Sequence, residues 1–117
     1  MMRIANQSGM RIVGPNCMGI AAFDPNMMIT FGTSMLNLPP ELGPVSIVSQ
    51  SGAFGSVAYA EARHRHLGVR LWATTGNEAD VNIADCLNYF VADPETKVIL
   101  MYFEASRDGA KLMAGVG

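Results

Sequence analysis

Small polar residues follow a short apolar run near the middle of the chain. Residues 45–48 read Val-Ser-Ile-Val, and Ser49-Gln50-Ser51-Gly52-Ala53 comes next, with helical character from Ser51 to about residue 66. The first turn of a helix carries unpartnered N–H groups and partial positive charge, and small side chains let an anion approach them. The pattern therefore indicates phosphate binding at Ser51, Gly52 and Ala53. An ordinary strand-to-helix turn uses the same residue types.

A carboxylate follows the most apolar run of the chain. Glu104 comes directly after residues 98–103, Val-Ile-Leu-Met-Tyr-Phe, so we expect it near the edge of a sheet with little water around it. Such a group needs a partner. It either caps the next helix or orients and charge-stabilises a histidine during phosphoryl transfer. The nearby Asn77, Glu78 and Asp80 fit ordinary turn and cap chemistry.

A third candidate lies in the turn after residues 10–13. The rigid Gly-Pro pair at 14–15 presents the amide of Asn16 at a fixed place, and Cys17 follows it. Cys17 is either a nucleophile or, since no base is close in sequence, a small buried thiol. We expect no metal site, because Cys17 and Cys86 are far apart in sequence and His64 and His66, two residues apart, face different sides of a helix.

Composition narrows the class of protein. Half of the 117 residues are hydrophobic, 15% are charged and the net charge is −2, which suits one packed α/β domain or a piece of a larger one. No basic run recommends a nucleic-acid partner, since the cations at 63–66 complement the end of a helix that Gly68 caps. No run is long enough to span a membrane. Two cysteines fit reduced thiols and a cytoplasmic location.

The elements that must position these residues alternate along the chain. We expect a helix tail over residues 2–9, a short strand over 10–13 and an irregular connector over 21–42 with weak strand character near 28–31. Strands follow at 45–48, 69–74 and 98–103, the last a central strand buried on both faces. Helices are expected at 52–66, after an Asp80 cap, and at 107–114. The order predicts a parallel sheet with ligands at the carboxyl ends of its strands.

Four motifs stand in a characteristic order: Gly14-Pro15-Asn16-Cys17-Met18-Gly19, Val48-Ser49-Gln50-Ser51-Gly52-Ala53, Gly76-Asn77-Glu78-Ala79-Asp80 and Tyr102-Phe103-Glu104. Together they resemble the NDP-forming acyl-CoA synthetases, which include the succinyl-CoA synthetase α subunit, over nearly the whole chain. The third motif is more similar to the ADP-forming acetyl-CoA synthetase branch. The resemblance implies an α/β fold: a truncated flavodoxin-like parallel sheet (43–117), a linker (21–42), and before them the last strand of a CoA-binding Rossmann domain (1–20).

The resemblance also implies a reaction. Acyl-CoA, phosphate and a nucleoside diphosphate give the acid, CoA and the triphosphate through a phosphohistidine. Ser51, Gly52 and Ala53 match the helix start that holds the phosphoryl group, and Glu104 matches the acid that hydrogen-bonds the histidine. Asn16 and Cys17 match the turn beside the thiol end of CoA. The implied ligands are CoA, acyl-CoA and ATP/ADP with Mg²⁺, and the implied partner is an ATP-grasp β subunit or fused domain in an oligomer.

The family pattern also places a catalytic histidine several tens of residues after Glu104, and the chain stops at Gly117. His64 and His66 do not replace it, because they lie about 15–20 Å from Ser51 along the helix. We therefore expect a fragment that is inactive alone. One alternative is a non-catalytic CoA- or nucleotide-sensing module, such as that fused to protein acetyltransferases. Another is a flavin-binding flavodoxin, which Trp72, inside an expected strand, does not favour.

Overall fold

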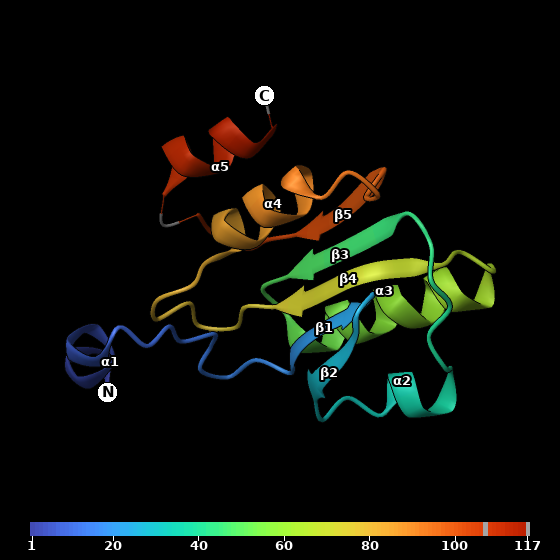
Figure 1. Cartoon of the computed structure of the whole chain (residues 1–117), viewed down its shortest axis with the longest axis horizontal. Coiled ribbons are helices and arrows are strands. Elements are labelled where there is room, and N and C mark those ends of the chain that lie inside the picture. Colours follow the sequence, from blue (N-terminus) through green and yellow to red (C-terminus); the bar gives the residue numbers. More distant parts are fainter. Residues whose placement is uncertain (107, 117) are drawn as a thin grey trace.

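A five-stranded sheet of mixed direction forms the centre of the computed structural model, which describes residues 1–106 and 108–116 (Figure 1). The strand order is β2-β1-β4-β3-β5. Three strands are parallel, namely β3 (Val45–Ser49), β4 (Val69–Thr74) and β5 (Val98–Tyr102). The antiparallel hairpin of β1 (Gly19–Phe23) and β2 (Asn26–Thr30) extends the sheet beside β4. The prediction of an α/β fold is confirmed.

Helices cover both faces of this sheet. On one face, α3 (Gly52–His64) packs against β3 and β4, with the short α2 (Ser34–Asn37) beside it. On the other face, α4 (Ile83–Ala92) packs against β3 and β5, and α5 (Gly109–Val116) packs on α4. The N-terminal α1 (Met2–Ser8) stands at one end of the molecule (Figure 1). No described helix has the length and apolar character needed to cross a membrane.

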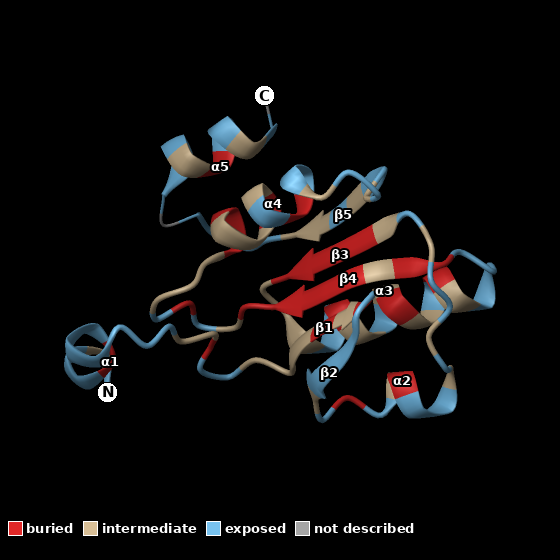
Figure 2. Cartoon of the chain, viewed as in Figure 1, coloured by how far each residue is buried: buried red, intermediate tan, exposed pale blue. Residues whose placement is uncertain are grey.

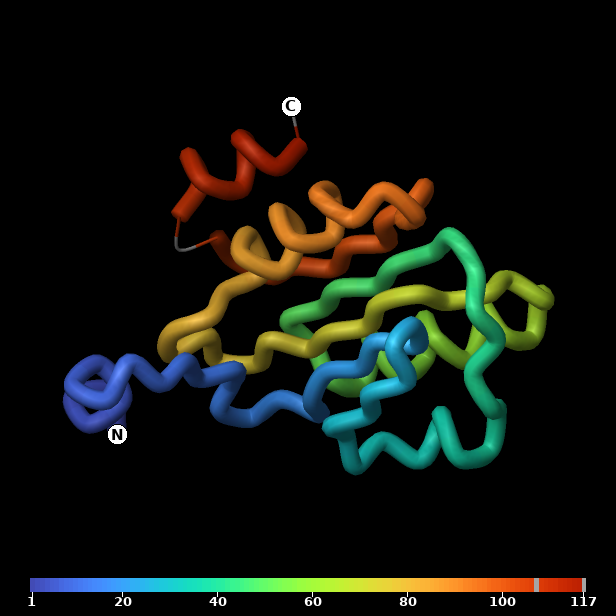
Figure 3. Tube along the Cα trace, in the orientation of Figure 1, coloured from blue at the N-terminus to red at the C-terminus, as the bar shows by residue number. Residues whose placement is uncertain are grey.

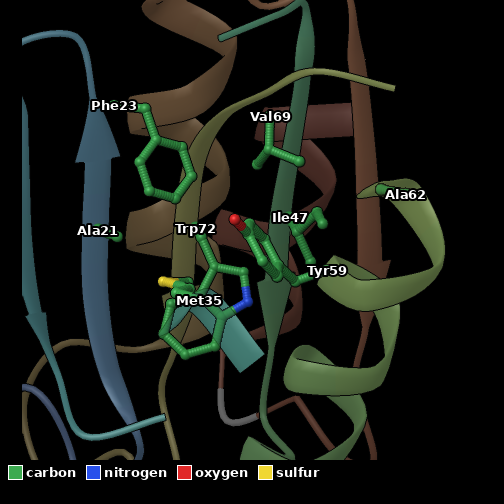
Figure 4. Close-up of a cluster of buried hydrophobic side chains, with 8 residues drawn as sticks. All are labelled: Ala21, Phe23, Met35, Ile47, Tyr59, Ala62, Val69 and Trp72. Carbon is green, nitrogen blue, oxygen red and sulfur yellow. The ribbon is translucent and has the colours of Figure 1, made fainter. Parts of the chain in front are cut away.

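Alternating side chains of the central strands divide the core in two. On the α3 face, Trp72 and Ile47 pack with Tyr59 of the helix (Figure 4). On the α4 face, Val48 and Leu71 pack with the residues of the second cluster: Ala73, Ile83, Ala84, Leu87, Phe90 and Leu112. Burial is concentrated in β3 and β4, whereas β2 is largely exposed (Figure 2). Because successive strand residues point to opposite faces, one buried strand supplies both clusters.

The helix that carries the predicted phosphate site is fixed closely to the sheet. The indole N–H of Trp72 donates to the carbonyl of Gly55 at 2.9 Å. A Cβ atom at Gly55 would lie 2.8 Å from Cγ2 of Thr74, so glycine permits this close approach of helix and strand. The start of α3 is therefore held at the carboxyl end of β3.

The connector predicted over 21–42 is wrong for residues up to 30, which form most of the hairpin. The signal was weak because β2 is exposed on both faces, and its residues show no periodic burial. The prediction of a strand at residues 10–13 is also wrong, because this segment forms only a single parallel bridge, between Val13 and Val81. The assignment of residues 1–20 to a separate Rossmann domain stays a prediction.

Three details of the expected elements also differ. The cap of α4 is Asn82, not Asp80, because Asn82 and Asp85 exchange side-chain and backbone hydrogen bonds in a capping box. The left-handed residue after α3 is His66, with φ of 58°, rather than Gly68. The strand expected at the centre of the sheet, β5, is an outer strand whose Val98 and Leu100 are exposed. The last expected helix began at Arg107, which lies outside the described residues.

Candidate functional site

The start of α3 presents backbone donors toward a cavity. Ser51 caps the helix, and its Oγ accepts the N–H of Phe54 at 3.2 Å. Ser49 fixes the cap by donating to the carbonyl of Ser51 at 2.7 Å and accepting its N–H at 3.1 Å. In the part of the chain that the structure describes, the N–H groups of Gly52 and Ala53 have no hydrogen-bond acceptor. They are therefore available to an anion, and the helix dipole favours negative charge there.

The side chain of Gln50 joins this helix start to the loop after β5. Its Oε1 accepts the backbone N–H groups of Glu104 at 2.6 Å and Ala105 at 3.1 Å. Its Nε2 donates to the carbonyl of Ala105 at 2.7 Å. Glu104 itself is exposed, so the expectation of little water around it is wrong. The reason is that β5 is the outermost strand on its side of the sheet, and its end is open to solvent.

The turn that contains Asn16 lies against the loop after β4. The N–H of Asn77 donates to the carbonyl of Pro15 at 2.9 Å, and the Asn16 amide donates to Oδ1 of Asn77 at 3.3 Å. Gly76, with φ of 60°, packs so closely on the carbonyls of Pro15 and Asn16 that a side chain has no room. The two segments run side by side in Figure 3. Asn16 and Cys17 are thus held at the carboxyl end of β4.

An ion pair secures the same two segments further from the cavity. The guanidinium of Arg11 donates to both carboxylate oxygens of Asp80, at 2.9 and 3.0 Å. One of these oxygens also accepts the N–H of Ile12 at 2.9 Å. The hydrogen bond from Arg11 holds the pKa of the Asp80 carboxyl below its ordinary value. Asp80 therefore fixes the N-terminal segment instead of capping α4.

Glu78 is the buried carboxylate of the site, a place that sequence reasoning gave to Glu104. Glu78 is 4% exposed and has a left-handed backbone with φ of 54°. Its Oε1 accepts the hydroxyl of Thr75 at 2.8 Å and the N–H of Ile83 at 2.9 Å. The expected turn-and-cap role is correct in kind, because Glu78 satisfies a donor at the start of α4. Its burial had no signal in the sequence.

These segments enclose a cavity of about 590 Å³. All of the predicted site residues line it: Asn16, Cys17, Ser51, Gly52, Ala53 and Glu104. Gln50, Asn77 and Glu78 line it as well, together with two residues that sequence reasoning missed, Met18 and Phe31. Met18 lies within the Gly-Pro-Asn-Cys motif, which was the available signal, whereas Phe31 follows β2, which was predicted only as weak strand character near 28–31. The structure brings the candidates together, and their roles stay predictions.

Cys17 is the thiol that lines this cavity, whereas Cys86, His64 and His66 do not line it. The Cys17 sulfur lies 3.6 Å from the carbonyl of Val13 and lines the cavity. Burial raises the pKa of the Cys86 thiol to about 12, so Cys86 is not a nucleophile near neutral pH. His64 ends α3 and His66 follows it, at the opposite end of the helix from Ser51. Among the described residues, no cluster of His, Cys, Asp and Glu side chains has the arrangement of a metal site.

Comparison with known proteins places this chain in one family. Residues 42–116 match the model of the succinyl-CoA ligase like flavodoxin domain. The chain is 35% identical to the α subunit of acetate–CoA ligase (ADP-forming) I of Pyrococcus furiosus, over 97% of this chain and 24% of that protein. It is 38% identical to the acetate–CoA ligase (ADP-forming) of Methanocaldococcus jannaschii, over 90% of this chain and 14% of that protein.

A solved structure agrees with these relatives. The dinucleotide forming acetyl-coenzyme A synthetase 1 of Ca. Korarchaeum cryptofilum, in complex with phosphate and ADP, superposes with a TM-score of 0.82 and 33% identity. The match covers 97% of this chain and 24% of that one. The chain belongs to the succinyl-CoA ligase like flavodoxin family, and its homologues include α subunits of ADP-forming acyl-CoA ligases. It spans about a quarter or less of the length of these relatives.

Proposed function

We propose that this chain is the phosphate-binding part of an NDP-forming acyl-CoA synthetase. The observation that carries the proposal is the cavity that Gly52 and Ala53, whose N–H groups have no acceptor among the described residues, line together with Asn16, Cys17 and Glu104. A helix start with two available donors suits a phosphoryl group, and the rigid turn beside it suits the end of a thioester. The relatives named above, which are ADP-forming ligases, support the same reading.

The proposed reaction has three transfers. An oxygen of inorganic phosphate attacks the thioester carbonyl, the C–S bond breaks, and CoA leaves as a thiolate that takes up a proton. The resulting acyl phosphate passes its phosphoryl group to a histidine nitrogen and releases the carboxylate. The phosphohistidine then transfers the group to a nucleoside diphosphate, which becomes the triphosphate. We assign the histidine, and an ATP-grasp unit that binds ADP with Mg²⁺, to other parts of the complete protein.

Six residues that line the cavity have a role in this proposal. Gly52 and Ala53 bind the phosphate oxygens, and the dipole of α3 stabilises charge that develops on them. Glu104, on the loop held by Gln50, hydrogen-bonds the incoming histidine and favours its charged form. Asn16 and Cys17 lie beside the thiol end of CoA. The complete protein is proposed to be an oligomeric cytoplasmic enzyme that contains an ATP-grasp subunit or domain.

A pair of substitutions at Gly52 tests the phosphate site. Ser51 is extended, with φ of −89° and ψ of 121°, so the backbone before residue 52 allows proline at the first helical position, and proline removes the N–H of residue 52. The matched control Gly52→Ala adds the same Cβ beside Met18, at 2.6 Å from Cγ, and keeps the N–H. Loss of one charge-assisted hydrogen bond corresponds to roughly a 10- to 100-fold weaker interaction.

The assay measures triphosphate formed by the complete protein from acyl-CoA, ADP and phosphate. We expect Gly52→Pro to raise KM for phosphate at least about tenfold relative to Gly52→Ala. Equal values for the two variants would remove the phosphate role from this helix start. A wild-type protein that binds CoA but forms no triphosphate would instead be the non-catalytic sensing module.

A further inference from the structure

A second, apolar cavity, which is shallow and open to the surface, lies beside the proposed phosphate site. It has a volume of about 290 Å³ and shares Cys17, Met18 and Phe31 with the larger cavity. Its remaining lining residues are Gly19, Ile29 and Thr30 of the β1–β2 hairpin. We call these six residues the acyl annex. Of the apolar cavities among the described residues, this one shares lining residues with the phosphate-site cavity.

Met18 lines both cavities, and three neighbours surround its side chain. Its Sδ accepts the hydroxyl of Ser56 at 3.2 Å, on the first turns of α3. Its Cγ would lie 2.6 Å from a Cβ at Gly52, and its Cε 3.2 Å from a Cβ at Gly32. The side chain thus spans from the helix start to the end of the hairpin. A group bound at Gly52 therefore has Met18 as its immediate apolar neighbour.

Phe31 is placed at the mouth of the annex by the hydrogen bonds of Thr30. The Thr30 hydroxyl donates to the carbonyl of Met18 at 2.7 Å and accepts the N–H of Gly32 at 3.0 Å. Because these two bonds occupy the Thr30 hydroxyl, the surface that the annex offers to substrate is mainly apolar. Phe31 is 76% exposed, which means that the fold itself gains little from this ring. A large exposed aromatic ring beside a cavity is typical of a ligand contact.

We propose that the acyl annex binds the acyl group of the substrate and that Phe31, Met18 and Ile29 determine which acyl groups are accepted. The inference rests on the phosphate-binding function proposed above. Phosphate held at Gly52 and Ala53 must lie within bonding reach of the acyl carbonyl carbon, so the acyl chain begins next to Met18. The apolar opening beyond Met18 is the annex, which suits uncharged aliphatic or aromatic acyl groups.

A series of thioesters tests this assignment in the complete protein. kcat/KM is measured for acetyl-CoA, isobutyryl-CoA and phenylacetyl-CoA at saturating phosphate and ADP. We expect Phe31→Ala to lower the preference for phenylacetyl-CoA over acetyl-CoA about tenfold, because the lost ring contacts the larger group most. Met28→Ala is the matched control, since Met28 lies on β2, the strand that Phe31 follows in the chain, is 48% exposed and lines neither cavity. It should leave the preference unchanged.

Three outcomes overturn the inference. An equal effect of Phe31→Ala on all three thioesters assigns the annex to the arm of CoA that they share. No effect on any of them means that substrate does not touch Phe31. A wild-type protein that turns over none of the thioesters removes the proposed function together with the annex, and this result is distinct from the other two. Both substituted side chains are exposed, and unfolding temperatures confirm that each variant is folded.

Discussion

Thr75 donates its hydroxyl to Oε1 of Glu78 across 2.8 Å, and both side chains are buried beneath the start of α4. The same oxygen accepts the N–H of Ile83, the first residue of that helix. The Glu78 carboxylate therefore connects the loop after β4, which borders the cavity, to α4, which lies on the face of the sheet opposite α3. Its burial makes the loop a rigid part of the fold.

Removing the Glu78 side chain should destabilise the protein more than removing its charge alone. Glu78→Ala leaves two buried donors without an acceptor, and we expect a loss of about 2–4 kcal/mol in the free energy of unfolding. Glu78→Gln keeps an oxygen at the same place and should lose about 1 kcal/mol. Both variants retain the left-handed backbone, so they share its strain. Urea unfolding of both provides the comparison, and equal losses would contradict the role of the acceptor.

The Gln50 side chain should control the order of the loop that carries Glu104. In Gln50→Ala, the N–H groups of Glu104 and Ala105 lose their acceptor, and their hydrogen exchange should become about tenfold faster. Gln7→Ala is the control, because Gln7 is an exposed residue of α1, away from this loop. Exchange is followed residue by residue. Unchanged protection at both amides would show that the loop is held by other contacts.

The ion pair between Arg70 and Asp93 predicts a specific pH dependence of stability. The hydrogen bond from Arg70 Nε at 2.6 Å, and a second from Thr96, lower the pKa of the Asp93 carboxyl. A carboxyl with a lowered folded-state pKa stabilises the fold above its unfolded pKa, and that stabilisation disappears as the pH falls through the folded value. Asp93→Asn should therefore be less stable than wild type at pH 7.

The difference between Asp93→Asn and wild type should shrink from about pH 5 downward and vanish below the lowered pKa, which lies under 3.8. Unfolding midpoints measured across this range check the prediction. Glu95→Gln removes a carboxylate two residues away that makes no ion pair within the described chain. It should not reproduce the pattern, and a difference in Asp93→Asn that is constant with pH would argue against the ion pair.

The two cysteines should react with thiol reagents at very different rates. Burial raises the pKa of Cys86 to about 12, so its thiolate is scarce at pH 8. Cys17 is half-buried and lines the cavity, so reagents reach it directly. Labelling of the native protein should give one fast thiol, and Cys17→Ser should abolish that phase. Fast labelling that persists in Cys17→Ser would mean that Cys86 becomes exposed.

Local sequence predicted the parallel part of the fold because each of its strands is a distinct apolar run. The hairpin was predicted only as weak strand character near 28–31, since Met27, Met28 and Ile29 are exposed and show no alternation of burial. The run at 98–103 predicted burial on both faces. In β5, Ile99 and Met101 pack on the α4 side, while Val98 and Leu100 line an apolar groove beside α3. Whether an apolar strand is buried on one face or on both depends on the strand order of the sheet, which is a tertiary property that local sequence does not determine.

The sequence predicted those parts of the candidate site in which a short motif by itself determines the local backbone structure. Ser51, Gly52 and Ala53 form a helix start because a capping serine precedes small residues. The roles of Asp80 and Asn82 could not be separated, since both residue types cap helices and the choice depends on Arg11, 69 residues away. For the same reason the expected burial of Glu104 was wrong: burial at the end of a strand depends on which strand lies at the edge of the sheet.

The β1–β2 hairpin adds one more consequence. Gly19, with φ of 115°, packs so tightly on Ile29 that the turn of chain into the hairpin is fixed, whereas the outward side chains of β2 are unconstrained by packing. The donors at the start of α3 come from a different segment, anchored by Trp72. In the proposed function, Ile29 and Phe31 therefore influence selectivity from a segment separate from the phosphate-binding donors. Substitutions at these two positions should change the acyl preference and keep the N–H donors at the start of α3.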